Sequence, residues 1–378
     1  MKKIFVLQPN FNAISEVWLD RMTELLQDHI IGIAAYNPSA KNWRNKIPVY
    51  DLLKPRYSFL QRLLMKIKLS TPHRTLLEKQ LLFKISKADI LLVHYINTAV
   101  DYLNMLSKTN IPIFVHVHGF DVFIDTIEIG GKYYFDSDYK DKILELSNRV
   151  TFISNSRFTT NKLLNLGIPP DKIMLKYFGV PNQNARIWHN QNSVNILFLG
   201  RLVDFKRPDI VIKAFIKACD GGLNGQLIVA GDGPFRVTCE LLKMESQYGD
   251  RITITGAVDY NRAEDLYKWA DIYSMHSSFG IFSNNEEAFG VSLIEAMSFG
   301  LPIVTANGGA ITEIVENGVT GFIVKQNDID EHADAFLKLY HNRELLSQMG
   351  KNAQLRQMER FTIQIEQNRL FEIFKLTN

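Results

Sequence analysis

Short apolar runs rich in β-branched residues recur along the chain, and this rhythm constrains the fold more than any other feature of the sequence. In the first half of the chain, the runs alternate with helical patterns at 4–7, 30–35, 89–95, 111–119 and 150–154. The alternation restarts at 194–200, 226–231, 251–256, 271–277, 301–306 and 321–324. Apolar strands that alternate with helices are typical of βα units on a parallel sheet. The sequence therefore predicts an α/β protein with two doubly wound, Rossmann-like domains.

A polar segment without a periodic pattern, residues 181–193, separates the two series and reads as a linker. We accordingly expect an N-terminal domain at 1–182 and a C-terminal domain at 190–359, with a terminal helix in 360–378 that packs back on the first domain. Two doubly wound domains joined by one hinge form a cleft, where the carboxyl ends of both sheets can meet a ligand.

Charge is distributed unevenly along the 378 residues, although the formal net charge is only +3. Residues 1–180 hold 24 Lys and Arg against 16 Asp and Glu, whereas the remainder holds 19 against 24. The two cysteines, Cys219 and Cys239, are too few for a disulfide framework. No apolar run reaches the roughly 18 residues of a membrane span. We expect a soluble, cytoplasmic protein whose halves meet different partners.

Residues 54–87 form the most basic segment, with nine Lys or Arg and one acidic residue. Apolar residues between 59 and 67 recur there at helical spacing beside the basic ones. Two interpretations stay open: a helix resting on an anionic membrane surface, or an ordinary helix with a solvated basic face. Nucleic acid is not an expected partner, because no stacking aromatics interleave the charges.

Glycine-rich phosphate loops are absent from the expected positions. The chain after the first strand, "QPNFNAISE", has no glycine, so the pyrophosphate turn of a dinucleotide-binding fold is missing. Gly231 and Gly233 follow a later strand, but Pro234 stands where a helix would open. No GxxxxGK[ST] motif occurs, which excludes a P-loop.

Charged residues in the second half of the chain are candidates for a ligand-binding site. Arg201 and Lys206 lie in the loop that leaves the first strand of the second domain, where two cations can neutralise a diphosphate. A solvated surface loop is the alternative for them. Glu295 sits inside the apolar helix expected at 291–299, and a buried carboxylate needs a partner. Glu287 precedes that helix by four residues.

In combination these motifs resemble the retaining GT-B glycosyltransferases of family 4. The segments that carry the resemblance are "GRLVDFK" at 200–206, the E-x7-E of Glu287 and Glu295, "HGFD" at 118–121, "ISNSRFTTNKLLNLGIPPDKI" at 153–173, "YFGV" at 177–180, "VAGDGP" at 229–234, "TGAV" at 255–258 and "GGAITEIVENGVTGFIV" at 308–324. With "ISEVW" at 14–18, "HGFD" is similar to the branch of bacterial exopolysaccharide and O-antigen transferases.

The resemblance implies a donor site in the second domain. Glu287 would contact the transferred sugar, and Glu295 the ribose hydroxyls, so that ribose rather than a side chain is the partner expected for Glu295. Over eight residues a helix rises roughly 12 Å, which suits two carboxylates serving two ends of one ligand. The remaining donor-binding residues are Arg201 and Lys206 at the diphosphate, Phe289, Gly290, Val291 and Ser292 at the phosphate-binding helix start, and Val258 at the base.

On the first domain, the resemblance places His118 near the reacting sugar, so that the implied catalytic residues are Glu287, His118, Arg201 and Lys206. Asp121 is expected on the acceptor side, where it holds the loop rather than acting as a base. Ser15 and Glu16 are expected at the acceptor as well. His116 and His118 share one face of a strand, but two histidines without a third ligand favour a structural role over a metal site.

The resulting expectation is a retaining hexosyltransferase of cell-surface polysaccharide synthesis that needs no metal or other cofactor. It would transfer a sugar from a UDP- or GDP-linked donor to a saccharide or lipid-linked glycan. A nucleotide-sugar epimerase of the same fold and a catalytically silent partner subunit are the alternatives. The location would be cytoplasmic, with peripheral attachment to the inner face of the plasma membrane if residues 54–87 contact lipid.

Overall fold

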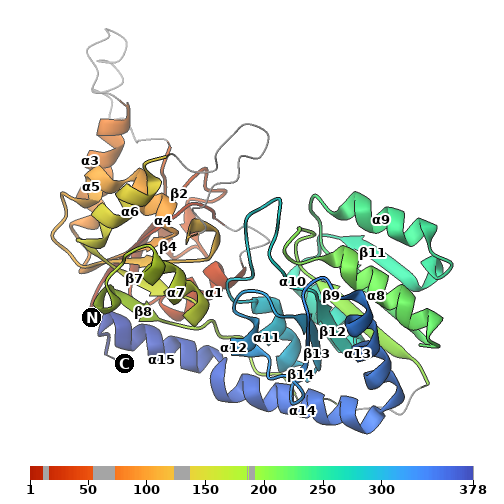
Figure 1. The fold of residues 1–378 in the computed structure, drawn as a ribbon. Helices are drawn as coiled ribbons and strands as arrows, with labels where there is room; N and C mark the ends of the chain where they lie inside the picture. Colours follow the sequence, from red (N-terminus) through yellow and green to blue (C-terminus); the bar gives the residue numbers. More distant parts are fainter. Residues whose placement is uncertain (12–16, 54–72, 123–136, 185, 187–191, 378) are drawn as a thin grey trace.

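The computed structural model describes residues 1–11, 17–53, 73–122, 137–184, 186 and 192–377. Two parallel sheets dominate the architecture, and helices cover both faces of each (Figure 1). The first sheet lies before the expected linker in the sequence and the second lies after it. The prediction of two Rossmann-like α/β domains is therefore confirmed.

The first domain is built on eight strands in the order β3-β4-β2-β1-β5-β6-β7-β8, parallel except for the β3–β4 pair. Its elements are β1 (Ile4–Gln8), α1 (Val17–Leu25), β2 (Ile30–Ala35), β3 (Asn42–Trp43), β4 (Ile47–Asp51), α3 (His73–Ile85), β5 (Ile90–His94), α4 (Ile96–Asp101), α5 (Leu103–Leu106), β6 (Ile113–His116), η2 (Phe120–Val122), α6 (Tyr139–Ser147), β7 (Val150–Ser154), α7 (Arg157–Asn165), η3 (Pro170–Lys172) and β8 (Ile173–Leu175).

Burial of both faces explains why the central strands read as continuous apolar runs. In β1, Phe5 and Leu7 point into one hydrophobic cluster, whereas Ile4 and Val6 point into a second cluster on the other face of the sheet. Side chains alternate between faces along a strand, so each face takes every second residue. The second cluster also contains residues of α15, from the far end of the chain.

The second domain has six parallel strands in the order β11-β10-β9-β12-β13-β14, so the strand order reverses between β9 and β12. Its elements are β9 (Val194–Leu199), α8 (Pro208–Asp220), β10 (Gly225–Ala230), α9 (Arg236–Glu245), η4 (Gly249–Arg251), β11 (Ile252–Gly256), α10 (Tyr260–Trp269), β12 (Ile272–Met275), α11 (Val291–Ser298), β13 (Ile303–Ala306), α12 (Ile311–Ile314), β14 (Gly321–Val324), α13 (Ile329–His341) and α14 (Arg343–Arg360), and the chain then continues into α15 (Ile363–Phe374).

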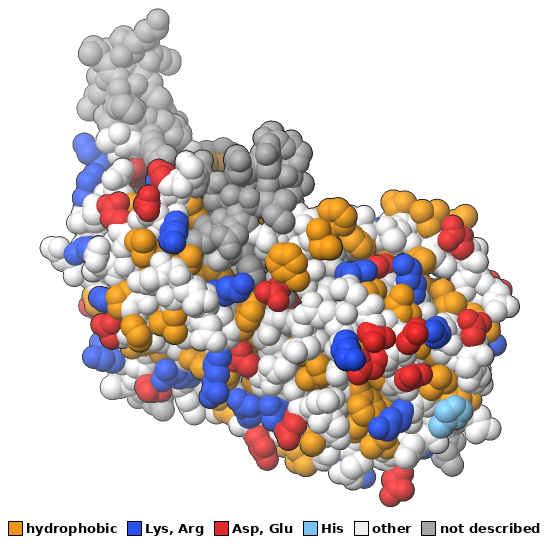
Figure 2. Space-filling view, in the orientation of Figure 1, with side chains coloured by type: hydrophobic (Ala, Val, Ile, Leu, Met, Phe, Trp, Pro, Cys, Tyr) orange, Lys and Arg blue, Asp and Glu red, His pale blue; other side chains and the backbone are white. Residues whose placement is uncertain are grey.

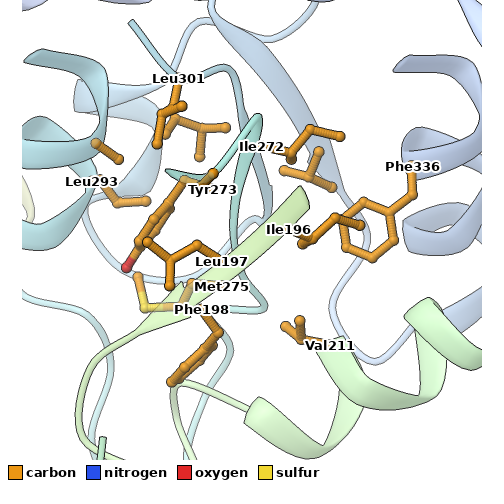
Figure 3. Close-up of a cluster of buried hydrophobic side chains, with 14 of the residues drawn as sticks. Ile196, Leu197, Phe198, Val211, Ile272, Tyr273, Met275, Leu293, Leu301 and Phe336 are labelled. Carbon is orange, nitrogen blue, oxygen red and sulfur yellow. The ribbon is translucent and has the colours of Figure 1, made fainter. Parts of the chain in front are cut away.

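The core of this domain lies around the two strands at the reversal. Figure 3 shows Ile196 of β9 on the side of Phe336 of α13, and Tyr273 of β12 on the side of Leu293 of α11. All four residues are at most 2% exposed and belong to one hydrophobic cluster. Packing on both faces fixes the ends of β9 and β12, from which the site loops start.

All eleven strands expected from the sequence are present, but three others were missed. β3 has only two residues, and β4 contains Pro48, which interrupts a strand pattern. β8 lies at the sheet edge with half-buried side chains, so its sequence lacks the buried run that marks the central strands. These three strands lie at or next to the edges of the sheet, where burial constrains the sequence least.

The chain ends by returning from the second domain to the first. Figure 1 shows α14 along the lower edge of the second domain and α15 continuing along the first, close to the N-terminus. At the junction the amide of Val180 donates to the carbonyl of Phe361 at 2.9 Å. Gly179 allows this approach, because a Cβ there would lie 2.3 Å from the Thr362 carbonyl oxygen.

A buried ion pair locks α15 onto the first domain. The carboxylate of Glu366 accepts from Lys176 Nζ with one oxygen and from the amide of Gly179 at 2.7 Å with the other. Lys176 is 1% exposed and Glu366 is 3% exposed. Burial lowers the pKa of Lys176, and the Glu366 carboxylate opposes that shift. The helix thus supplies the counter-charge of an ammonium group that has lost its water.

Among the described residues, none of the helices combines the length and the apolar character needed to cross a bilayer. Most of the basic segment predicted from the sequence, residues 54–72, lies outside the described residues. Its remainder, residues 73–87, forms α3 and the turn that follows it.

Removing the Glu366 carboxylate tests how strongly α15 is held. We expect Glu366→Ala to lower the free energy of unfolding of the first domain by ~3–5 kcal/mol, because the Lys176 ammonium stays buried without a counter-charge. Denaturant unfolding measures the change. The control is Glu372→Ala on the same helix, which removes an exposed pair with Arg369 and should cost less than ~1 kcal/mol. Equal losses in both variants would contradict the proposed lock.

Candidate functional site

The candidate site of the second domain lies at the carboxyl ends of β9 and β12, where the strand order reverses. In open α/β sheets, ligands bind in the crevice at such a switch point. One loop leaves β9 with Arg201 and Lys206, and another leaves β12 and leads through Glu287 into α11. The sheet therefore brings together charged residues that are 81 positions apart in the sequence.

An ion pair joins the two loops. Lys206 Nζ lies 2.5 Å from Glu287 Oε2, and each side chain is 11% exposed. Lys206 also approaches the sulfur of Met275 at 3.6 Å. Arg201 is exposed, with its guanidinium carbon 5.9 Å from the centroid of the Phe205 ring, and its side chain makes no hydrogen bond or ion pair with the part of the chain that the structure describes. Arg201 is thus available to an anion.

The start of α11 has the form expected of a phosphate-binding helix. Gly290 is its N-terminal cap with φ 98°, and a Cβ there would lie 2.7 Å from Leu293 Cδ1. The first amides of a helix have no acceptor within the helix, so those near Val291 and Ser292 are open to a ligand. The Ser292 hydroxyl is already bound, because it accepts from Tyr273 at 2.8 Å.

Glu295 has side-chain partners, contrary to our expectation that a ribose alone would serve it. Its Oε1 lies 3.2 Å from Arg21 Nη2, and its Oε2 accepts from the Tyr267 hydroxyl at 3.1 Å. Arg21 belongs to α1 of the first domain and also donates to the carbonyl of Gly179 at 3.2 Å. This pair could not be predicted from the sequence, because its members are 274 residues apart. The two carboxylates thus have different side-chain partners: Lys206 for Glu287, and Arg21 with Tyr267 for Glu295.

Two further donor-site candidates lie at the edge of the site. Phe289 is 2% exposed and stacks on Tyr177 with the ring centroids 5.7 Å apart. Its side chain is therefore part of the packing between the domains, which leaves only its backbone for a donor. Val258 is half-buried in the loop after β11 and packs against the domain core. A contact of Val258 with a base stays a prediction.

A carboxylate of the second domain binds the N-terminus of a helix in the first. Glu313 of α12 accepts from the amides of Arg157 and Phe158 at 2.8 Å each, and from the Tyr177 hydroxyl at 2.9 Å. A negative charge is favourable beside the unsatisfied amides and the positive dipole end of α7. With the Arg21–Glu295 pair, this contact holds the two domains in one arrangement.

On the first domain, three histidines gather at the carboxyl ends of β5 and β6. His94 and His116 are register partners on these strands, and His118 follows two residues later. The Nδ1 of His94 lies 3.2 Å from the Nε2 of His118. Burial lowers the pKa of all three, for His94 to about 3, so the rings are neutral at pH 7. His94 is thus a third histidine beside His116 and His118, and the expectation that these two lack a third ligand is wrong.

Asp121 holds the loop after β6, as expected. Its carboxylate accepts from the amides of Ile96 at 2.8 Å, His118 at 3.0 Å and Gly119 at 2.9 Å. Burial raises the pKa of Asp121 to about 6, because desolvation outweighs these donors. Because both carboxylate oxygens accept from backbone amides, Asp121 fixes the position of His118 and does not extend toward a ligand. Ser15 and Glu16 lie outside the described residues.

Sequence reasoning missed Arg21, Tyr267, Trp18 and His94. The Trp18 ring lies 4.2 Å from the His118 ring and 5.2 Å from that of Phe178, measured between centroids. A partial signal existed for His94, because it lies near the end of the strand expected at 89–95, which precedes the strand of His116 in the sequence. For Arg21 and Tyr267 there was none, since both lie on ordinary amphipathic helices.

Asp121 provides a test of the loop. We expect Asp121→Ala to lower the free energy of unfolding of the first domain by several kcal/mol, because each of three amides left without an acceptor costs ~1–3 kcal/mol. The exposed Asp141 in α6 gives the matched control, since Asp141→Ala should change the stability by less than ~0.5 kcal/mol. Thermal or denaturant unfolding measures both. Equal stability of the two variants would show that the amides find other acceptors.

Comparison with known proteins gives a family match for the second domain. Residues 181–356 match the family described as Glycosyl transferases group 1. The chain is 28% identical over 158 residues to the alpha-D-kanosaminyltransferase of Streptomyces kanamyceticus, covering 42% of this chain and 39% of that protein. It is 27% identical over 155 residues to a GDP-mannose-dependent alpha-(1-6)-phosphatidylinositol monomannoside mannosyltransferase of Mycobacterium tuberculosis, covering 41% of this chain and 40% of that protein. The match thus spans about two fifths of the length of these relatives.

Solved structures resemble the whole chain. Anabaena HepE, in a complex with UDP and glucose, superposes with a TM-score of 0.75 at 18% identity, covering 100% of both chains. The sucrose-phosphate synthase of Thermosynechococcus elongatus superposes with a TM-score of 0.75 at 16% identity, covering 99% of this chain and 98% of that one. The chain therefore has the GT-B fold, and the match to the Glycosyl transferases group 1 family lies in its second domain.

Proposed function

We propose that the protein is a glycosyltransferase that moves a sugar from a nucleoside diphosphate to a saccharide or lipid-linked glycan. The observation that carries the proposal is the Lys206–Glu287 pair beside the exposed Arg201 at the switch point of the second sheet. The similarity of part of the chain to mannosyl- and kanosaminyltransferases supports it. UDP and GDP both remain candidate donors, as do the hexoses that they carry.

The charges of the site suit a diphosphate without a metal. Lys206 has three N–H donors and uses one of them on Glu287 at 2.5 Å. A diphosphate could take the others, with Arg201 and the amides at the start of α11 as further donors. Glu287 would then turn toward a sugar hydroxyl. These groups would supply the charge neutralisation that a bound cation provides in other transferases.

For the reaction we propose retention of configuration by a front-face step, which rests on the resemblance to family 4. The bond from the anomeric carbon to the diphosphate oxygen breaks, and the acceptor oxygen bonds to the same face of that carbon. The acceptor proton passes to the leaving phosphate oxygen, which Arg201 and Lys206 hold. His118 would orient the sugar, since its loop is fixed by Asp121.

Glu295 can bind a ribose while it keeps its protein partners. A carboxylate offers about four lone-pair positions, and Arg21 and Tyr267 occupy two of them. With 21% of its side chain exposed, Glu295 has room for a hydroxyl donor. In this arrangement Arg21 would connect donor binding in the second domain to the position of α1 in the first.

Two alternatives make different predictions. A nucleotide-sugar epimerase of the same fold would bind the nucleotide and convert the sugar without an acceptor. A catalytically silent subunit would bind no nucleotide in a way that depends on Lys206. This chain has all four charged residues expected at the donor site, namely Arg201, Lys206, Glu287 and Glu295. Their joint presence favours the transferase over both alternatives.

The charge substitutions test the activity. We expect Lys206→Ala and Glu287→Ala each to lower kcat/KM by about 10²–10³, the effect of removing one preorganised group from a charged transition state. Nucleotide released from a panel of UDP- and GDP-sugars is measured, with and without saccharide acceptors. Lys268→Ala is the control, since that lysine forms an exposed pair with Glu264 on α10 and should leave the turnover unchanged. Near-normal turnover in both site variants would refute the assignment.

We also propose that the basic segment contacts an anionic membrane surface, where a lipid-linked acceptor would lie. In its described part, Phe83 of α3 is 60% exposed, and Lys87 Nζ lies 4.5 Å from the centroid of its ring. Figure 2 shows further hydrophobic side chains along the upper edge of the second domain, over α9. Val237, Leu241 and Met244 are exposed on that helix.

Liposome flotation tests the membrane contact. Each cation near the surface of an anionic bilayer contributes about 1 kcal/mol. The combined change of Lys79, Lys84 and Lys87 to Glu should therefore abolish co-flotation with phosphatidylserine vesicles. Raised salt should have the same effect. The control changes three exposed lysines of α6, α13 and α14 to Glu, namely Lys140, Lys338 and Lys351. Equal binding by both triple variants would reject the proposal for α3.

A further inference from the structure

The three histidines of the first domain have the geometry of a metal site. In His94, His116 and His118 one nitrogen of each ring lies within 4.8 Å of those of the other two. The register of β5 with β6 places His94 beside His116, and alternation along the chain puts His118 on the same face. Strand pairing, rather than a flexible loop, thus sets the positions of the first two rings.

Several of these nitrogens lack a partner although they are buried. Both ring nitrogens of His116 and the Nδ1 of His118 form no hydrogen bond with the residues that the structure describes. His116 is 0% exposed and His94 is 1% exposed. An unsatisfied buried polar group costs ~1–3 kcal/mol. Each neutral imidazole also has a lone pair, which is what a metal ion requires. The cluster as it stands is therefore incomplete.

We propose that His94, His116 and His118 bind a divalent transition-metal ion, with Zn²⁺ as the best fit. Zinc–imidazole bonds of about 2.0–2.1 Å in a tetrahedral arrangement put the nitrogens about 3.4 Å apart. The His94–His118 pair already stands at 3.2 Å. The widest pair would have to close by a little over 1 Å, which a rotation of the imidazole rings can supply. Nitrogen-only ligands exclude Mg²⁺ and Ca²⁺, which prefer oxygen.

The surroundings define what kind of zinc site this is. Three protein ligands leave the fourth position for water or another small ligand. Trp18 and Phe178 cover the cluster, with their ring centroids 4.2 and 6.3 Å from that of His118. The nearby Lys176 is balanced by Glu366, so the pair adds no net charge against the metal. Zinc here would tie β5, β6 and the loop that follows β6 together. The ligand set includes His118, for which the proposed function offers a sugar-orienting role, and the inference does not rest on that role.

Direct binding tests the proposal on the full chain. Chelator-stripped protein is titrated with Zn²⁺ by calorimetry, and Co²⁺ absorption reports a tetrahedral nitrogen site. We expect one Zn²⁺ per chain, a higher thermal midpoint with Zn²⁺, and an affinity at least ~100-fold lower in His116→Ala, since even outer-shell changes cost 10–100-fold. His116→Gln gives a second variant that fills the space if the alanine variant unfolds.

The exposed His341 in α13 is the matched control, and His341→Ala should bind Zn²⁺ as the unchanged protein does. Binding that falls with His341→Ala, or that stays the same in both His116 variants, would overturn the proposal. So would the absence of stoichiometric Zn²⁺ binding by the unchanged chain. Because every readout is binding or stability, a failed transferase assay does not bear on this result.

Discussion

The direction of the parallel strands is the constraint on which the rest of the structure depends. All strands of the second sheet run the same way, so β9 and β12 both deliver their loops to one edge. Lys206 and Glu287 meet there because the strand order reverses between these two strands. The first sheet repeats the principle with His94 and His116. In both domains, the order and direction of the strands bring the functional side chains together, and side-chain contacts then set their exact positions.

Buried or half-buried carboxylates make several of the polar contacts between distant segments. Glu295 reaches Arg21, Glu313 reaches the amides at the start of α7, and Glu366 reaches Lys176. Each links segments that are more than 150 residues apart. Apolar packing brings these segments together without choosing their exact orientation, whereas a carboxylate that must be satisfied accepts few geometries. The carboxylates therefore specify how the domains face each other.

The sequence predicted the architecture well because burial on both faces of a central strand leaves a clear pattern. The positions of Lys206 and Glu287 in loops after strands and the glycine before α11 are also legible in the sequence, whereas their roles at a donor rest on the resemblance to family 4 and stay predictions. The partners of Glu295 could not be predicted, since Arg21 lies on α1 of the other domain. His94 was overlooked for a different reason: the order of neighbouring strands had to be known before its register with His116 could matter. Long-range pairing is what a single sequence leaves unspecified.

The return of α15 has a consequence for how the protein is made. Residues Leu370, Ile373 and Phe374 complete a hydrophobic cluster that also contains Ile4 and Met22, and Glu366 neutralises Lys176. During synthesis the N-terminal half leaves the ribosome first, but part of one face of its sheet stays uncovered and Lys176 stays without its partner until α15 emerges. The first domain to be translated thus completes its hydrophobic core only after the second domain has been translated.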